Sequence, residues 1–162
     1  MAITITTATL TDLPRMFEVE QACFQKPWSY ELLEAEFSHD QARIRVAWQR
    51  DPWGKEAEKL VGFCICWVVA DELQILQIAV EPAHQRQGIG RILLRDVLKI
   101  AKMEQAPKLF LEVRASNKAA IGLYLSCDFE ETGVRKKYYQ SPTEDAVVFV
   151  RNLEIHTVYL RR

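Results

Sequence analysis

Residues 72–100 read as a strand, a glycine-containing turn and a helix in direct succession, and this segment limits the fold more than any other. The strand ELQILQIAV (72–80) leads into EPAHQRQGIG (81–90), a turn with two glycines one residue apart. The apolar residues that follow recur at helical spacing: Ile89, Leu93, Val97 and Ile100. A strand that passes through a tight turn into an amphipathic helix is typical of α/β proteins.

Within this strand the apolar residues change phase. In a regular strand Leu73 and Ile75 would lie on one face, whereas Leu76, Ile78 and Val80 would lie on the other. A slip of one residue is what a β-bulge produces, and bulges often lie beside active sites. A strand buried on both faces gives the same pattern, so the sequence leaves both interpretations open.

The rest of the chain alternates between strand-like and helix-like segments. Further strands are expected at 3–6, 43–49, 60–70, 108–115, 129–140 and 145–160. Further helices are expected at 11–24, 26–37 and 117–129, with Thr11 and Ser29 as N-caps of the first two and Asn117, after Ser116, at the start of the third. This order predicts a single α/β domain over residues 1–162 with a sheet of mixed strand direction, and 154–162 is a candidate C-terminal extension.

Composition and charge narrow the functional classes. The 162 residues are 49% hydrophobic and 27% charged, with a formal net charge of −1. Proteins that coat nucleic acids or lie on membranes usually carry a basic excess, so neither partner is expected. The apolar run LVGFCICWVVA (60–70) is about half of the roughly 20 residues that cross a membrane. Because the N-terminus also lacks the features of a signal peptide, we expect a cytoplasmic protein.

The four cysteines lie mostly within apolar patterns: Cys23, Cys64, Cys66 and Cys127. Their spacing fits none of the usual zinc motifs, so no metal site is expected. We expect small buried side chains, with neither disulfides nor a catalytic thiol among them.

The turn before the helix at Ile89 could bind a phosphate group. The first N–H groups of a helix lack intrahelical partners and carry the positive end of the helix dipole, and glycines let a ligand approach the main chain. The turn is no P-loop, because no Lys-Ser/Thr follows, and Leu93 stands where the dinucleotide motif has its third glycine. On its own it fits a structural turn equally well.

Longer stretches around this turn resemble the GNAT superfamily of N-acetyltransferases, which bind acetyl-CoA. QRQGIGR (85–91) resembles the family's pyrophosphate motif. The segments IAVEPAHQRQGIGRILL, LEVRASNKAAIGLY, FEETGVRKKYY and EDAVV follow one another as in the RimI branch, and KPWS (26–29) resembles its Pro-Trp-Ser segment. The resemblance covers nearly the whole chain, although the connection 50–59 is longer than compact members need. It implies a mostly antiparallel sheet with a bulged, splayed central strand, flanking helices and acetyl-CoA as cosubstrate.

The resemblance also implies which residues contact acetyl-CoA. The main chain of the bulged strand would pair with the pantetheine arm at Ile78, Ala79 and Val80. The turn and the first helical turn would hold the pyrophosphate through Arg86, Gln87, Gly88, Ile89, Gly90 and Arg91. Asn117 matches a further contact with CoA. The later basic residues of the helix are expected to face solvent: Arg95, Lys99 and Lys102.

One strand carries a candidate proton acceptor. In KLFLEVR (108–114), Glu112 shares a face with Phe110 and Arg114, opposite the apolar face. Burial beside an aromatic ring would make it a better base near neutral pH. The alternative is a salt bridge to Arg114 or Lys108, which is the usual outcome for a lone strand glutamate. The resemblance favours catalysis, because Glu112 stands where the RimI branch has its proton acceptor.

Tyr124 is the candidate proton donor. A tyrosine in an apolar helical stripe is most often a core residue whose hydroxyl is satisfied at the edge. The resemblance implies instead that it protonates the CoA thiolate. Because the ordinary pKa of a phenol, about 10, exceeds that of a thiol, about 8.5, this transfer needs help from geometry or environment.

The acceptor is expected to be a protein N-terminus. At pH 7 roughly 10% of an α-amine but only about 0.04% of a lysine amine is neutral, so a moderate base serves the α-amine more easily. The resemblance implies a small-subunit ribosomal protein that begins with alanine. Glu72 could bind the ammonium or a peptide amide, with an exposed strand-end charge as the equal alternative. Tyr138 and Tyr139 resemble the peptide-facing segment of the branch, and one of the two is expected in the core.

Other functions stay open on the sequence. They are acetylation of lysines or a small amine, a catalytically silent acyl-CoA-binding module, and plain nucleotide binding. The presence of both Glu112 and Tyr124 argues against a silent module. We expect a monomer or a weak dimer.

Overall fold

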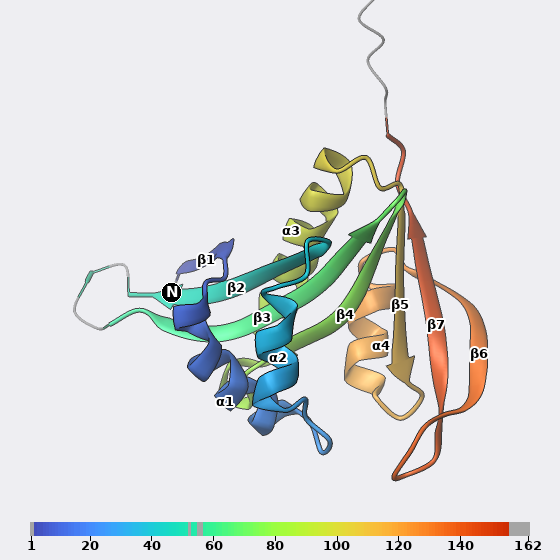
Figure 1. The fold of residues 1–162 in the computed structure, drawn as a ribbon, viewed down its shortest axis with the longest axis horizontal. Helices are drawn as coiled ribbons and strands as arrows, with labels where there is room; N and C mark the ends of the chain where they lie inside the picture. The colour runs from blue at the N-terminus through green and yellow to red at the C-terminus, as the bar shows by residue number, and fades with distance from the viewer. Residues whose placement is uncertain (1, 52, 55–56, 156–162) are drawn as a thin grey trace, which may run out of the picture. The chain divides into compact units, whose positions relative to one another are not determined.

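A computed structural model of the chain describes residues 2–51, 53–54 and 57–155 (Figure 1). Among them seven strands form one sheet in the order β1-β2-β3-β4-β5-β7-β6. The strands are β1 (Ala2–Thr7), β2 (Ala42–Arg50), β3 (Lys59–Val69), β4 (Glu72–Val80), β5 (Lys108–Arg114), β6 (Glu130–Tyr139) and β7 (Glu144–Asn152). The helices are α1 (Leu13–Cys23), α2 (Tyr30–Glu36), α3 (Ile89–Met103) and α4 (Lys118–Leu125). The predicted α/β fold with a mostly antiparallel sheet is confirmed.

The chain divides into two compact units. One comprises residues 1–67 and 75–97, and the other comprises residues 68–74 and 98–162. The first unit therefore holds α1, α2, β1 and β2, and most of β3, β4 and α3, whereas the second holds β5, α4, β6 and β7.

In the first unit α1 and α2 bury an apolar stripe against β2 and β3. Leu13, Met16 and Val19 of α1 recur at helical spacing and are fully buried, as is Leu33 of α2. They belong to one hydrophobic cluster that also contains strand residues, among them Ile44, Val46, Phe63, Ile65 and Ala79. The hydrophobic periodicity of the sequence thus directs these two helices onto the sheet.

β3 is buried on both of its faces. Residues 60–66 are buried without interruption, whereas a strand with one solvated face would alternate. The register of β3 against β2 shifts between Ala47 and Trp48, which leaves Val61 as an extra residue in β3. Val61 O accepts the hydrogen bond of Glu81 N at 2.8 Å, so this irregularity lies beside the start of the turn 81–88.

β4 lies very close to β3 and is at least half-buried on both faces. A Cβ on Gly62 would lie 2.8 Å from Ala79 O, a distance that real side chains do not show. Ala79 is buried in the hydrophobic cluster of the first unit. Leu76, which would lie on the opposite face of a regular strand, packs against the same cluster. Burial on both faces therefore accounts for the change of phase, and the bulge in β4 stays a prediction.

In the second unit β7 pairs antiparallel with both β5 and β6. Alternate residues of β5 are buried: Leu109, Leu111 and Val113. Phe149 lies opposite Leu111 in the register, and its ring centroid is 6.0 Å from that of Tyr124 in α4. α4 therefore packs on the apolar face of β5 and β7, and Glu112 belongs to the opposite face.

The pairing of β6 with β7 is irregular. Arg135 pairs with Ala146 and Tyr139 with Glu144, so four steps along β6 correspond to two steps along β7. Lys137, within this stretch, has a left-handed backbone with φ +52°. The extra residues interrupt the alternation of faces that a regular strand would impose on residues 135–139.

The predicted N-cap of the first helix is wrong, whereas that of the second is confirmed. Thr11 lies inside a 3-10 turn (Leu10–Asp12) that leads directly into α1. The cap lies two residues earlier, because Thr9 N donates to Asp12 Oδ2 at 2.8 Å. Ser29 caps α2, since its hydroxyl oxygen accepts from Leu32 N at 3.2 Å.

The last strand is shorter than the sequence predicts. β7 ends at Asn152, and residues 153–155 are not part of a strand. Residues 156–162, with most of the expected extension, lie outside the described part of the chain, as do residues 52, 55 and 56 of the connection 50–59.

Candidate functional site

The turn between β4 and α3, in the first unit, contains left-handed backbone conformations and helix N–H donors. Arg86 has φ +62° and Gly88 has φ +82°. The first intrahelical bond runs from Ile92 N to Gly88 O at 3.1 Å, so the N–H groups of the first helical turn point toward the N-terminal end of α3. A Cβ on Gly88 would meet nothing within 4 Å. These donors and this open space fit an anionic phosphate.

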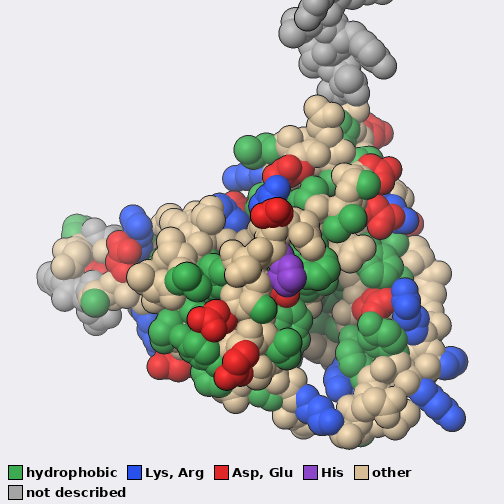
Figure 2. Space-filling view, viewed as in Figure 1, with side chains coloured by type: hydrophobic (Ala, Val, Ile, Leu, Met, Phe, Trp, Pro, Cys, Tyr) green, Lys and Arg blue, Asp and Glu red, His purple; other side chains and the backbone are tan. Residues whose placement is uncertain are grey.

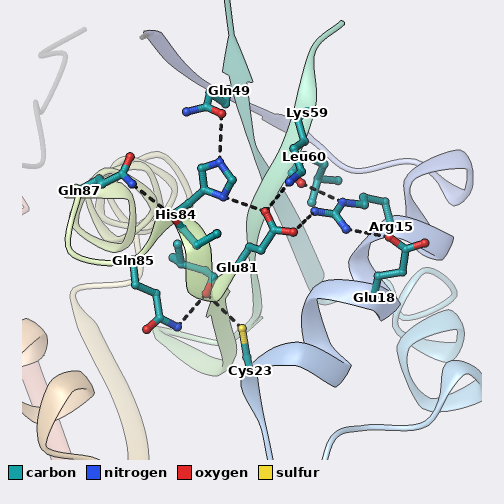
Figure 3. Close-up of polar contacts among 12 residues, drawn as sticks. Arg15, Glu18, Cys23, Gln49, Lys59, Leu60, Glu81, His84, Gln85 and Gln87 are labelled. Carbon is teal, nitrogen blue, oxygen red and sulfur yellow. Dashed lines mark hydrogen bonds and ion pairs between the residues drawn. The ribbon is translucent and has the colours of Figure 1, made fainter.

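Two glutamine side chains tie the turn to its own backbone (Figure 3). Gln85 Nε2 donates to Val80 O at 3.0 Å, and Gln87 Nε2 donates to Ala83 O at 3.3 Å. Gln87, expected beside the pyrophosphate, therefore uses its amide nitrogen to close the turn. Both bonds join the end of β4 and the residues before α3 into one local structure.

Glu81 anchors the turn to three other elements (Figure 3). Its carboxylate lies 2.5 Å from Arg15 Nη2 of α1, 2.8 Å from Lys59 Nζ of β3 and 2.7 Å from His84 Nδ1. His84 Nε2 lies 3.1 Å from Gln49 Oε1, which extends the contacts to β2. Burial raises the pKa of Glu81, but hydrogen bonds from Lys59 and Arg15 outweigh it and lower the pKa to about 2. Glu81 is thus ionised at neutral pH.

Cys23 borders the same turn, and its thiol is bonded to the main chain (Figure 3). Its thiol donates to Val80 O at 3.1 Å, so this carbonyl accepts from both Cys23 and Gln85. Burial, together with the charge of Glu20, raises the pKa of the thiol to about 11. The other cysteines are buried, as expected: Cys64, Cys66 and Cys127.

α3 separates apolar from basic residues as the sequence predicts. Its buried face holds Ile89, Leu93 and Val97. Its basic residues are exposed: Arg91, Arg95, Lys99 and Lys102. The helix thus presents a charged face beyond its first turn.

Sequence reasoning missed Glu20, a fully buried carboxylate of α1. Its Oε1 accepts hydrogen bonds from Trp28 N and Gln77 Nε2, both at 2.8 Å, and so ties the KPWS segment to β4. Burial raises the pKa of Glu20, and this effect outweighs the two hydrogen bonds, which lower it. A signal was present, because Glu20 follows Leu13 and Met16 at the spacing of the apolar stripe.

Glu112 of β5, in the second unit, is paired with an arginine that the sequence did not indicate. Only 13% of its side chain is exposed, and Arg135 Nε of β6 lies 2.5 Å from its Oε1. A hydrogen bond to Glu112 raises the pKa of Tyr138, which lies on the same strand as Arg135. The structure thus brings Glu112 and Tyr138, two of the predicted site residues, together with Arg135.

The two cations that the sequence offers as alternative partners of Glu112 lie elsewhere. Lys108 Nζ pairs with Glu72 Oε1 at 2.9 Å. The guanidinium of Arg114 lies over the ring of Tyr139, 4.3 Å from its centroid. Glu72, a predicted substrate contact, is therefore a partly exposed carboxylate held by a lysine.

Neither tyrosine of the YY pair is a core residue, so that expectation is wrong. Tyr138 is 49% exposed and Tyr139 is half-buried, and their rings meet edge to face at 5.1 Å. Burial raises the pKa of Tyr139 to about 12, and the charge of Glu112 adds to this. The alternation rule fails here because β6 is an edge strand with extra residues.

Tyr124 is a core residue, as expected for a tyrosine in an apolar helical stripe. It is 4% exposed, and its ring contacts Phe129 at 5.9 Å and Phe149 at 6.0 Å. Asn117 caps the same helix, since its Oδ1 accepts from Ala120 N at 3.1 Å. The position of α4 on the apolar face of β5 means that Tyr124 and Glu112 flank this strand from opposite sides.

Acidic and basic side chains are interspersed over the face seen in Figure 2. Of the helices that the structure describes, none is both long and apolar enough to span a membrane. Over the same described residues, no cluster of three or more His, Cys, Asp or Glu side chains could hold a metal ion.

The sequence matches a known protein family over most of its length. Residues 13–129 match the model of the acetyltransferase (GNAT) family. The chain is 40% identical over 147 residues to the ribosomal protein bS18-alanine N-acetyltransferase of Escherichia coli strain K12, which covers 90% of this chain and 94% of that relative. It is 34% identical over 140 residues to the protein of the same name from Haemophilus influenzae. This match covers 85% of this chain and 90% of that relative.

Solved structures agree with these matches. The crystal structure of the ribosomal-protein-S18-alanine N-acetyltransferase from Escherichia coli superposes with a TM-score of 0.85 and 32% identity, over 99% of this chain and all of that one. A GNAT family acetyltransferase from Elizabethkingia anophelis with acetyl-CoA bound superposes with a TM-score of 0.74 and 23% identity. The superposition covers 93% of this chain and 98% of that one. The second comparison supports the fold alone.

Proposed function

This chain belongs to the GNAT family of acetyltransferases and is an N-acetyltransferase, and from this we propose that it acetylates the N-terminal α-amine of a ribosomal protein that begins with alanine, with acetyl-CoA as the donor. The observation that carries the proposal is the similarity to the Escherichia coli bS18-alanine N-acetyltransferase over 90% of the chain. A ribosomal substrate would place the reaction in the cytoplasm.

Acetyl-CoA is proposed to bind at the turn 81–91 and the strand end before it, where it supplies the activated acetyl group. The helix N–H groups at Ile89, Gly90 and Arg91 and the open space at Gly88 support a pyrophosphate site. The guanidinium of Arg86 would add positive charge there. The main chain of residues 78–80 would bind the pantetheine arm, and the cap residue Asn117 would make the further contact that the resemblance implies.

Glu112 is the proposed proton acceptor. It is a mostly buried carboxylate on a strand, and a group in this position can take a proton from the substrate ammonium and leave a neutral amine. The neutral amine can then attack the acetyl carbonyl directly. The proposed contacts of the acceptor peptide are Tyr138, Tyr139 and Glu72. Tyr138 is hydrogen-bonded to Glu112, and the charge of Glu112 acts on Tyr139.

Tyr124 is the proposed proton donor to the departing sulfur of CoA. Its ring is fixed by Phe129 and Phe149, so the hydroxyl is already oriented before the reaction. Because Tyr124 and Glu112 flank β5 from opposite sides, they would serve different reactants, one the sulfur and the other the amine.

Two peptides test the choice of acceptor. One begins with a free alanine and lacks lysine, and the other has a blocked N-terminus and one internal lysine. Incubation with acetyl-CoA and mass spectrometry should show acetylation of the first alone. Acetylation of the second alone would make the protein a lysine acetyltransferase, and acetylation of neither would favour a small-amine substrate or a silent module.

A further inference from the structure

We propose that Arg135 is a positioning residue that pairs with Glu112 in the free enzyme and is displaced from it by the ammonium group of the substrate. The inference rests on the proposed function, since it takes Glu112 as the proton acceptor. It addresses a difficulty that the structure raises: Arg135 Nε lies 2.5 Å from Glu112 Oε1, so an oxygen of the proposed base is already occupied when the substrate arrives.

The register of three strands shows how Arg135 reaches Glu112. Glu112 lies opposite Val148 of β7, which in turn lies opposite Gly133 of β6. Arg135 is two residues further along β6, opposite the small side chain of Ala146, and so belongs to the same sheet face as Glu112. A long guanidinium side chain can therefore cross β7 diagonally to the carboxylate.

The irregular pairing of β6 supplies the second donor. Arg135 and Tyr138 are three residues apart and would point to opposite faces of a regular strand. The extra residues between Arg135 and Tyr139, with Lys137 in a left-handed conformation, let both side chains meet Glu112. The same irregularity places the guanidinium of Arg135 5.7 Å from the ring centroid of Tyr138.

The exposure of the two partners makes displacement feasible. The Arg135 side chain is 56% exposed on an edge strand, whereas that of Glu112 is 13% exposed. Arg135 can therefore turn into solvent without disturbing the core, and Glu112 stays in place. The incoming ammonium carries the same positive charge as the guanidinium of Arg135, so the carboxylate of Glu112 keeps a cationic partner throughout the exchange. One proton then passes from the ammonium nitrogen to Glu112, which returns it to water.

The charged and titratable groups around Glu112 in the second unit come from three strands. β5 contributes Arg114, β6 contributes Arg135, Tyr138 and Tyr139, and β7 contributes Glu144, which lies opposite Tyr139 and whose charge acts on it. Val148, opposite Glu112 on β7, does not titrate. Arg114 is engaged with the ring of Tyr139 and with the carbonyls of Gln140 and Pro142. Arg135 is therefore the exchangeable cation of this group.

The test compares kcat and KM of the alanine peptide for Arg135→Gln and Arg135→Lys with those of the wild type at pH 7. At this pH most of the α-amine is protonated, so its ammonium competes with Arg135 for Glu112. In Arg135→Gln we expect kcat to stay, because Arg135 has already left the complex, whereas KM should fall by about two- to fivefold, the range of a partly exposed ion pair. Arg135→Lys should restore the KM of the wild type.

Lys136→Gln is the matched control. Lys136 is the next residue, 80% exposed and paired with Asp145 at 3.0 Å, and its removal should change neither kcat nor KM.

Each contrary result overturns a stated part. If Arg135→Gln lowers kcat and leaves KM unchanged, Arg135 stays on Glu112 in the complex and displacement is wrong, and if it changes neither constant, the positioning role is wrong. If the wild type acetylates only the lysine peptide, the proposed acceptor is wrong, yet the same comparison with that peptide still tests Arg135. If neither peptide is acetylated, Glu112 takes no proton from them and both proposals fall.

Discussion

Glu112 differs from an ordinary surface glutamate in what surrounds its carboxylate. Its side chain is mostly buried, with a guanidinium on one oxygen and a tyrosine hydroxyl bonded to it. The carboxylate therefore meets the substrate with its oxygens already paired, and its cationic partner must be exchanged before the substrate ammonium can reach it.

The Glu112→Gln substitution removes the proton-accepting oxygen and keeps the size of the side chain. We expect kcat to fall about 100-fold or more, the usual contribution of a general base. Acetyl-CoA affinity, measured by calorimetry, should change little, because the turn 81–91 is unaltered. Glu131→Gln, an exposed position of β6, serves as the control. Equal losses of turnover and affinity would show that Glu112 has a structural role instead.

The Tyr124→Phe substitution removes one hydroxyl from a packed ring. Because water can replace the donor in part, we expect kcat to fall about 10- to 100-fold. The contacts with Phe129 and Phe149 persist, so the free energy of unfolding should fall by only about 1 kcal/mol, the worth of one hydrogen bond. Steady-state kinetics and urea denaturation measure the two effects. An unchanged kcat would exclude Tyr124 as the proton donor.

At the scale of elements, the strands and helices were predictable and the registers were not. Apolar periodicity and cap residues predict the order and type of the elements, because these signals are local. The extra residues at Val61 of β3 and between Arg135 and Tyr139 of β6 depend on partner strands that the local sequence does not identify. The change of phase in β4 left a bulge and burial on both faces open, and the burial of β4 is explained by the second.

The candidate site was predictable where the chain resembles its family and unpredictable where partners are remote in sequence. The turn 81–91 and Glu112 stand out in the sequence itself. The contacts of Glu81 with Arg15 and Lys59, and of Glu112 with Arg135, arise only when separate elements pack together. These contacts decide which cations lie against the two carboxylates, and the local sequence does not identify them.

Two glycine substitutions test the close approach of β3 and β4. Gly62→Ala would place a Cβ 2.8 Å from Ala79 O, and we expect it to reduce the free energy of unfolding by about 1–3 kcal/mol. Gly122→Ala lies in α4 with nothing within 4 Å of the added Cβ, and it should raise the free energy of unfolding by about 0.5–1 kcal/mol. Urea denaturation at pH 7 measures both. A stabilising Gly62→Ala would contradict the close packing of the two strands.

At the scale of the whole molecule, ion pairs centred on one carboxylate affect acid stability. The pKa of Glu81, about 2 in the folded protein against an ordinary 4.5, means that its contacts add stability at neutral pH. This shift corresponds to about 3 kcal/mol, present in full above about pH 5 and lost as the pH falls towards 2. The loop, α1, β2 and β3 share this one anchor.

The Glu81→Gln substitution should therefore lower the free energy of unfolding at pH 7 by about 3 kcal/mol and flatten its decline between about pH 5 and pH 2. Denaturation curves at several pH values measure this. Glu58→Gln breaks a more exposed pair with Arg50 and should change stability by less than about 1 kcal/mol. A Glu81→Gln protein with the acid dependence of the wild type would show that Glu81 does not carry this effect.

The central claim is that the protein acetylates an N-terminal α-amine in preference to a lysine. The most direct measurement uses one peptide that carries both a free N-terminal alanine and an internal lysine, treated with acetyl-CoA and the protein for less than one turnover of peptide. Tandem mass spectrometry then locates the acetyl group. Our account predicts acetylation at the alanine nitrogen with the lysine unmodified, and acetylation at the lysine with a free N-terminus would contradict it.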